Sequence, residues 1–314
     1  MLAKFILNGL LFGLALSLYI QPLLKVEQFV DEKEEKNEMV EEIVENVEKD
    51  SEEQAEEMIV SVFKQDGSVE KLGLEDYVMH VLPNEMPISF EKEALKAQAI
   101  ATRTYVLSRQ LEVDDSTLSQ VFLSDEDLRT KWQGDYEKNM ALVKEVVDET
   151  AGQILTYDSQ PITAAFFSSC AGKTNNVEDY WQSYLPYLRS VTSDEDLQAQ
   201  IYSQLSFTYE QLSDIFHSSI DELYISEWFD SGYVKSVVVD GQVYSGKQIR
   251  ELLGLSSHAF TIVLSDVVTF QCIGHGHGIG MSQIGANMMA KNGVSAEEIL
   301  HHYYTDVEIQ RVDV

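Results

Sequence analysis

The first feature of the chain is a run of uncharged, mostly apolar residues from Phe5 to Leu24, with Lys4 and Lys25 on either side. A run of this length is enough for a helix to cross a bilayer. We therefore predict that residues 1–25 form an N-terminal transmembrane signal anchor. The alternative is a cleaved signal peptide, with a weak cleavage site at residues 15–17 inside the run. In both cases the rest of the chain is exported.

The next segment, residues 26–57, reverses the pattern, because it holds fifteen acidic residues and three lysines. Such a segment cannot bury enough apolar surface to fold by itself, so we predict an acidic and largely disordered stalk. Val40, Ile43, Val44 and Val47 recur at helical spacing. They leave open a short helix or self-association.

From residue 58 onward, short apolar runs alternate with helical patterns and turn residues. This alternation predicts an α+β domain over 58–314 with several antiparallel strands. The expected strands are 58–63, 68–72, 153–157, 161–168, 233–239, 242–244, 258–264 and 267–272. The expected helices are 74–82, 90–109, 128–150, 247–253 and 280–291, the first of them stopping at Pro83.

The net charge of the chain limits the classes of molecule that it can bind. The formal net charge is −31 at pH 7, and it is still −19 when the stalk is left out. A strongly acidic surface repels nucleic acid and other anionic polymers. A substrate made of neutral sugars fits this charge better, provided that a local basic patch meets any acidic group.

Glu85 is the first candidate for chemistry. It lies in a predicted loop, 83–88, between two prolines, and the helix that follows carries Lys96 and Arg103 on one face. Burial beside apolar residues raises the pKa of a carboxylic acid and cations lower it, which is the balance that a general acid/base needs. The alternative is that Glu85 caps the helix or pairs with Arg103 for stability.

A second candidate is the glycine-rich segment GHGHGIGMSQIGA, residues 274–286. Alternate glycines let the backbone approach a ligand or another segment closely. The spacing matches neither a phosphate-binding loop nor a dinucleotide fingerprint. His275 and His277 form an H-x-H pair without carboxylate partners, which is more often a hydrogen-bonded structural pair than a metal site.

The remaining nucleophiles carry no catalytic signature. Ser168 and Ser169 lack a G-x-S-x-G elbow, and no local motif supports Cys170 acting with His277. Cys170 and Cys272 lie in the exported part, where a disulfide could persist, or they are simply small buried residues.

Several motifs occur in an order that resembles one family: LEDYVMHVLPNEMP, EALKAQAIATRTYVLSR, FFSSCAGKTNNVEDYW, PYLRSV, RELLGLSS and GHGHGIGMSQIGANMMAKNGVSAEEILHHYY. Together they resemble the stage II sporulation protein D family and, more distantly, the amidase enhancers. The resemblance begins near Met58 and runs to the C-terminus. It implies a lytic transglycosylase, without a cofactor, that acts on peptide-stripped peptidoglycan strands during engulfment of the forespore.

The resemblance also implies roles for single residues. Glu85 of N-E-M-P takes the position of the catalytic glutamate, and Lys96 and Arg103 take those of a functionally important lysine and arginine. In this interpretation Lys96 and Arg103 tune Glu85 and hold the lactyl carboxylate of the sugar, while the glycine-rich loop at residues 276–280 and Tyr180 or Tyr187 form the wall of the cleft. The expected substrate-binding residues are Lys96, Arg103, Tyr180, Tyr187, Gly276, His277 and Gly278. In this mechanism Glu85 protonates the glycosidic oxygen and then deprotonates the muramic acid 6-hydroxyl, closing a 1,6-anhydro ring.

The chain departs from the family at two places. His275 stands where an aromatic residue is usual. Some relatives hold zinc on H-x5-C-x5-C, but here Ala164 and Asn176 occupy the outer positions and Cys170 alone remains. A zinc site made of Cys170, Cys272 and His277 is the alternative, although no metal is expected.

The implied partners are peptidoglycan strands, a sporulation amidase (stage II sporulation protein P) and a polytopic membrane protein (stage II sporulation protein M), and no nucleic acid. The implied location is the membrane of a sporulating cell, with the catalytic domain outside the cytoplasm. The rival interpretation is a non-enzymatic glycan-binding protein that stimulates an amidase.

Overall fold

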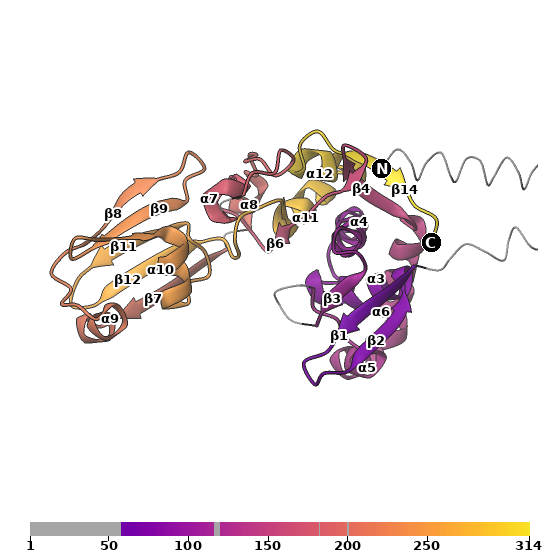
Figure 1. The fold of residues 1–314 in the computed structure, drawn as a ribbon, viewed down its shortest axis with the longest axis horizontal. Coiled ribbons are helices and arrows are strands. Elements are labelled where there is room, and N and C mark those ends of the chain that lie inside the picture. The colour runs from indigo at the N-terminus through magenta and orange to yellow at the C-terminus, as the bar shows by residue number, and fades with distance from the viewer. Residues whose placement is uncertain (1–57, 116–119, 182, 200) are drawn as a thin grey trace, which may run out of the picture. The chain divides into compact units, whose positions relative to one another are not determined.

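The computed structural model describes residues 58–115, 120–181, 183–199 and 201–314 (Figure 1). The predicted anchor, 1–25, and the predicted acidic stalk, 26–57, lie outside these residues. Across the part of the chain that is described, none of the helices is both long enough and apolar enough to span a membrane.

The described residues form helices and mostly antiparallel strands, which confirms the α+β class (Figure 1). The strands are β1 (Ile59–Phe63), β2 (Val69–Gly73), β3 (Glu112–Asp114), β4 (Gln153–Tyr157), β5 (Gln160–Pro161), β6 (Phe166–Phe167), β7 (Tyr202–Phe207), β8 (Leu223–Trp228), β9 (Val234–Val239), β10 (Gln242–Ser245), β11 (Phe260–Leu264), β12 (Val268–Ile273), β13 (Met281–Ser282) and β14 (Glu308–Arg311). The helices are α3 (Leu74–Glu85), α4 (Lys92–Ser108), α5 (Asp125–Trp132), the 3-10 turn η2 (Gln133–Asp135), α6 (Tyr136–Glu149), α7 (Val177–Trp181), α8 (Glu195–Gln198), α9 (Tyr209–Phe216), α10 (Gly246–Leu253), α11 (Gln283–Lys291) and α12 (Ala296–Tyr303).

Helix α4 is at the centre of the first hydrophobic core. It packs against α3, α6, α11, α12 and strand β4. Its buried side chains include Ala94, Ala97 and Ala101, which favour a helix and leave room for neighbouring elements to come close. Glu85 ends α3, and its backbone is held by Gln283 of α11, which also bonds to Gln98 of α4, so this core positions the candidate site.

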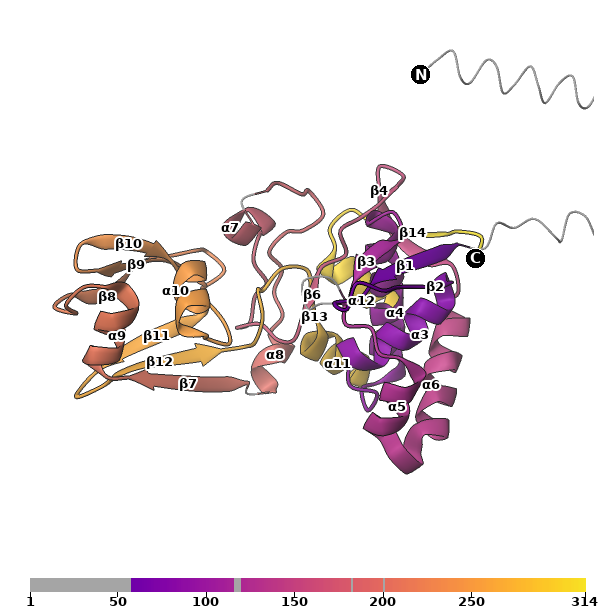
Figure 2. The same cartoon turned by 60° about the horizontal axis from the view of Figure 1, so that its bottom comes forward.

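The second hydrophobic core lies between the sheets β10-β9-β8 and β11-β12-β7 (Figure 2). Strand β12 shows why one face of its sheet is buried, because Val268, Phe270 and Cys272 alternate with Thr269 and Gln271. Helices α9 and α10 also contribute side chains to this core.

Several bounds predicted from the sequence are wrong. The strand expected over 161–168 is instead two short strands, β5 and β6, with residues 162–165 between them. Helix α3 does not stop at Pro83 but continues to Glu85. Its last backbone hydrogen bond runs from the Met86 N–H to the Leu82 carbonyl at 3.0 Å. Burial of the turn around Pro83 outweighs the lost N–H of the proline. The helix expected over 128–150 is interrupted at Gln133, whose φ of 48° is left-handed.

Candidate active site

Glu85 is the last residue of α3, where the partial negative charge of the helix end disfavours a carboxylate. Its Oε1 accepts a hydrogen bond from the Val121 N–H at 2.7 Å. Burial raises the pKa of Glu85, and the Val121 bond lowers it in part. Among the described residues this N–H is the one donor to the carboxyl group. A carboxylic acid held in this way is protonated at higher pH than usual, and its anion is still partly stabilised.

The backbone of Glu85 is held by α11. The Gln283 side-chain amide donates to the Glu85 carbonyl at 2.7 Å and to Gln98 Oε1 of α4 at 3.1 Å. Nearby, the Asn287 side chain accepts from the Glu91 N–H at 2.8 Å. Gln283 is therefore a positioning residue that sequence reasoning missed, although it lies inside the glycine-rich segment 274–286.

Apolar side chains, uncharged polar groups and one lysine surround the helix end that carries Glu85. Met86 is fully buried, and the buried Tyr77 hydroxyl donates to Gln120 Oε1 at 2.8 Å. Lys131 Nζ donates to the Pro83 carbonyl at 3.0 Å, and burial lowers the pKa of this lysine. No sequence pattern pointed to Lys131, because its proximity depends on the packing of α5 against the end of α3.

Arg103 does not meet Glu85. Its side chain is fully buried, and its guanidinium donates to both carboxylate oxygens of Glu75 at 2.8 and 2.5 Å. A third bond goes to the Gln153 carbonyl at 3.0 Å. Three elements, α3, α4 and β4, are therefore tied together by one arginine. The expectation that Arg103 faces the Glu85 loop is corrected by this geometry.

Lys96 lies on the same face of α4 as Arg103, as its spacing predicted, but this face carries its own acids. Lys96 Nζ contacts Glu93 at 2.8 Å and Glu149 at 2.7 Å. Gln98, two residues further along α4, lies on the opposite side of the helix and faces Gln283 and the Glu85 carbonyl. The structure therefore does not bring Lys96 to Glu85, and its predicted contact with substrate gains no support.

Tyr180 and His277 are brought together, with ring centroids 6.0 Å apart, and Trp181 lies 5.0 Å from His277. Two cations approach Tyr180. Arg250 Nη1 donates to the tyrosine hydroxyl at 2.7 Å, and Lys247 Nζ lies 4.8 Å from the ring centroid. This group, Tyr180, Trp181, His277, Lys247 and Arg250, is called the aromatic cluster below. Its two cations were not predicted.

His277 is neutral at ordinary pH. Burial, followed by the charge of Arg250, lowers its pKa to about 4. Its Nδ1 accepts a hydrogen bond from the Ile279 N–H at 3.0 Å, which leaves the ring proton on Nε2. A hydrogen bond with the backbone of Phe166 raises the pKa in part, so the ring N–H is also engaged within the fold. His277 is therefore a neutral ring in the aromatic cluster and does not serve as a cation.

Gly276 and Gly278 are required by close packing. Their φ values are +114° and +78°, and a Cβ atom would come within 2.8 Å of Phe167 and 2.7 Å of Tyr233 respectively. The alternate glycines thus let the backbone pass between two aromatic side chains. Their contribution to a cleft wall is through the position of His277 between them.

Tyr187 is placed elsewhere in the first core. Its hydroxyl accepts from the Thr163 N–H at 3.2 Å, and its ring contacts Tyr157 at 5.7 Å. Its side chain is 9% exposed. The structure therefore gives Tyr187 a packing role and records no contact between it and the aromatic cluster.

The two cysteines are free and buried. Cys170 bonds to Asp196, and Cys272 belongs to the second core, so they form no disulfide. Within the described ranges no three His, Cys, Asp or Glu side chains gather closely enough to hold a metal ion. The alternative zinc site of Cys170, Cys272 and His277 is therefore not formed there.

Comparison with known proteins places these residues in a family context. The family model described as SpoIID, stage II sporulation protein, matches residues 64–157. Stage II sporulation protein D of Bacillus subtilis (strain 168) is 38% identical over 263 residues, covering 78% of this chain and 77% of that protein. The protein of the same name from Bacillus amyloliquefaciens is also 38% identical over 263 residues, covering 78% of this chain and 76% of that protein. The amidase enhancer of Bacillus subtilis (strain 168) is 29% identical over 290 residues, covering 71% of this chain and 39% of that protein.

Proposed function

Because the chain belongs to the stage II sporulation protein D family, with a role in the cell wall during sporulation, we propose that it is a peptidoglycan lytic transglycosylase. Its substrate is a glycan strand stripped of stem peptides, and Glu85 is its acid/base. The observation that carries this proposal is the Glu85 carboxyl group, partly buried at a helix end with a raised pKa.

Glu85 differs from the other acids that burial affects. Among the described residues, three carboxyl groups have a pKa that is raised overall, with burial as the main cause, those of Glu85, Asp179 and Asp196. Asp196 accepts hydrogen bonds from both the N–H and the thiol of Cys170 and from two serine hydroxyls. Both of its carboxyl oxygens are therefore already bonded within the fold. Asp179 accepts from Asn176, its neighbour at the start of α7. Glu85 keeps a carboxyl oxygen for another partner.

One carboxyl group is enough for this reaction, because the nucleophile belongs to the substrate. A glycoside hydrolase of the usual kind needs two carboxyl groups. In the transglycosylase reaction the Glu85 carboxyl gives its proton to the glycosidic oxygen as the bond to muramic acid C1 breaks. The resulting carboxylate, stabilised by the Val121 N–H, takes the proton of the muramic 6-hydroxyl as O6 bonds to C1. The proton inventory balances and no water is consumed.

The aromatic cluster supplies groups that suit an amino sugar. Tyr180 and Trp181 offer ring surface for stacking, and Trp181 is 36% exposed. Arg250 makes no ion pair with any described carboxylate and is free to pair with the lactyl carboxylate of muramic acid. We assign this role to Arg250 rather than to Lys96 or Arg103, because those two cations are already paired with acids.

The membrane anchor, the location at the engulfing membrane, and the amidase and polytopic membrane partners remain proposals that follow from the family. A second function, non-enzymatic glycan binding that stimulates an amidase, is favoured by the name of one relative, the amidase enhancer. The two functions differ in whether the purified chain releases products.

The deciding experiment is product analysis by mass spectrometry after incubation with peptide-free glycan strands in H2(18)O. The proposal predicts 1,6-anhydro-muramic ends without heavy oxygen. Reducing ends that carry heavy oxygen would indicate a hydrolase, and binding without any product would favour the amidase-stimulating function.

A further inference from the structure

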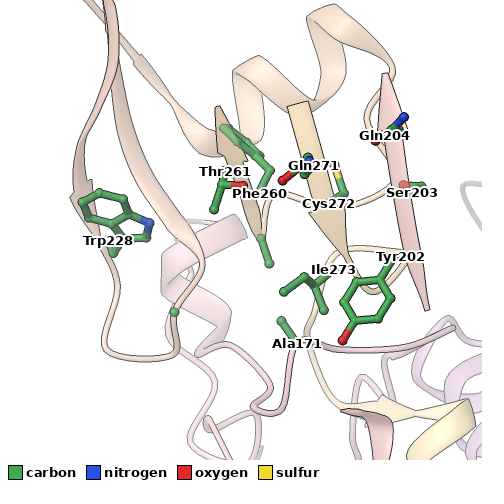
Figure 3. A pocket seen from close by; sticks show the side chains of 12 residues that line it. Ala171, Tyr202, Ser203, Gln204, Trp228, Phe260, Thr261, Gln271, Cys272 and Ile273 are labelled. Carbon is green, nitrogen blue, oxygen red and sulfur yellow. The ribbon is translucent and has the colours of Figure 1, made fainter. Parts of the chain in front are cut away.

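A cavity of about 680 Å³ lies outside the residues matched by the family model, on the second core's sheet β11-β12-β7 (Figure 3). Thr261, Gln271 and Gln204 form one row across its three strands, because Thr261 pairs with Gln271 and Gln271 with Gln204. Directly paired residues of antiparallel strands point to the same face. All three are exposed, whereas the neighbouring Phe260 and Cys272 point into the core.

Two exposed aromatic side chains border this row. Tyr202 is 61% exposed and lies two residues before Gln204 on β7, hence on the same face. Trp228 is 55% exposed and ends β8, which contacts β11 at the other side of the sheet. Figure 3 shows Tyr202 and Trp228 on opposite sides of the strand that carries Gln271. Neighbouring strands are about 4.8 Å apart and β12 lies between β7 and β11, so the backbones of β7 and β11 are separated by ~10 Å.

The lining of this cavity is uncharged, although the chain has a net charge of −31. A second cavity, beside Lys96, has a charged lining, which includes Glu93, Glu149, Glu297 and Arg311. An uncharged lining is therefore a feature of the first cavity and not of every cavity in this chain. In the first cavity the polar groups are amides and hydroxyls. Each glutamine offers two donors and an acceptor, so the floor can bond to hydroxyl and acetamide groups in either direction.

We propose that this surface, defined by Tyr202, Gln204, Trp228, Thr261 and Gln271 and called the sheet groove, binds a run of N-acetylated amino sugars as a second glycan site, through their ring faces, acetamide groups and hydroxyl groups. Aromatic rings that are exposed beside neutral hydrogen-bonding groups match the apolar faces and the polar edges of sugar rings. The separation of the two rings selects a chain of several sugars over a single one. The choice of a cell-wall glycan rests on the proposed function.

The sheet groove explains how a chain with so many negative charges holds its polymer. A strand bound here is retained between cleavage events by ring stacking and by hydrogen bonds to its acetamide and hydroxyl groups, while Glu85 acts on another part of the same strand. A protein partner of apolar character would leave the amide row without hydrogen bonds, which carries a desolvation cost. The glycan is therefore the occupant to which the lining points.

The probe is a hexamer of β-1,4-linked N-acetylglucosamine, added to the full-length chain in mild detergent. The background variant is Glu85→Gln with Trp132→Phe and Trp181→Phe, so that the probe is not cut and Trp228 is the one fluorescent tryptophan. We expect a saturable change in Trp228 emission. Tyr202→Ala should weaken binding about 10-fold, because it removes the aromatic surface on which the apolar face of a sugar ring is buried.

Two further variants make the result specific. Gln271→Ala, at an exposed position that does not disturb the core, should weaken binding several-fold. Tyr224→Ala is the matched control, because Tyr224 is 47% exposed on β8 but does not line the cavity, and it should leave the affinity unchanged. Circular dichroism checks that each variant is folded.

No saturable change, or unchanged affinity in both Tyr202→Ala and Gln271→Ala, would overturn the sheet groove as a glycan site. A response to an apolar dye but not to the hexamer would assign the surface to an apolar partner and would also overturn it. Failure of the proposed function is a separate result, because hexamer binding at Trp228 together with no anhydro products would leave the groove intact. Anhydro products together with no hexamer binding at Trp228 would overturn the sheet groove and leave the proposed function intact.

Discussion

The two faces of α4 use polar side chains in opposite ways. Toward Glu85 the helix presents Gln98, which is uncharged and bonds to Gln283. On the opposite face Lys96 and Arg103 are both paired with acids from other elements. Where charges are satisfied inside the fold they hold helices together, whereas the face without countercharges leaves one carboxyl group with a raised pKa and an unused oxygen. Function is therefore expected on the face that has the fewer charges.

The largest expected effect is on the uncharged face. Glu85→Gln keeps the shape of the side chain but cannot give or take a proton, so cleavage should fall about 100- to 10,000-fold. Glu91→Gln is the matched control, because this exposed residue lies between α3 and α4 and its side chain makes no hydrogen bond or ion pair with another described residue. It should cleave like the native chain. Cleavage assays on purified strands check both, and equal activity of the two variants would contradict the comparison.

The next effect is on the charged face and is seen in stability. Arg103→Met leaves Glu75 without its bidentate partner, so the free energy of unfolding should fall by about 3 kcal/mol. Adding Glu75→Gln should recover part of the loss. Urea denaturation measures both changes. If stability were unchanged and strand binding were lost, Arg103 would be a substrate contact as the sequence suggested.

A smaller effect is expected from the residue that holds Glu85 in place. Gln283→Ala removes the donors to the Glu85 carbonyl and to Gln98, so the carboxyl group should lose its alignment. We expect kcat to fall about 10-fold with KM little changed, because misplacement costs rate more than binding. Steady-state kinetics provide the check. A change in KM alone would mean that Gln283 contacts the strand directly.

The smallest effect belongs to Lys96. Its side chain is 20% exposed and shares two acids, so Lys96→Ala should cost about 1 kcal/mol of unfolding free energy. Cleavage and strand affinity should stay within a few-fold of the native values. Thermal denaturation and a binding titration check these expectations together. A tenfold loss of affinity would restore the substrate role that the family resemblance implied.

Sequence reasoning found Glu85 because its signal is local, a carboxylate between two prolines ahead of a helix. It also placed Lys96 and Arg103 correctly on one helix face. It could not tell which neighbours that face would meet, because Glu75 and Glu149 arrive there through tertiary packing. The spacing of residues within one helix determines which face a side chain lies on, but not which residues of other elements pack against that face.

The sheet groove left no trace in the sequence for a similar reason. Strand β7 was not predicted at all, because its side chains are mostly exposed and show little hydrophobic alternation. Gln204, Gln271 and Thr261 become neighbours only through the register of three strands. Sequence reasoning placed Tyr180 and His277 in the expected cleft wall. It did not place Arg250 or Lys247 there, although Arg250 begins the motif RELLGLSS, because the approach of α10 to Tyr180 depends on tertiary packing.

The measurement that tests the central claim most directly is a carbon-13 NMR titration of the Glu85 carboxyl, identified by its loss in Glu85→Gln. The account predicts a pKa above the ordinary 4.5, because burial disfavours the charged form. Cleavage needs the protonated acid, so its rate should decline as the pH rises through that same raised pKa. A pKa at or below 4.5, or a rate that does not follow the titration of Glu85, would contradict the account.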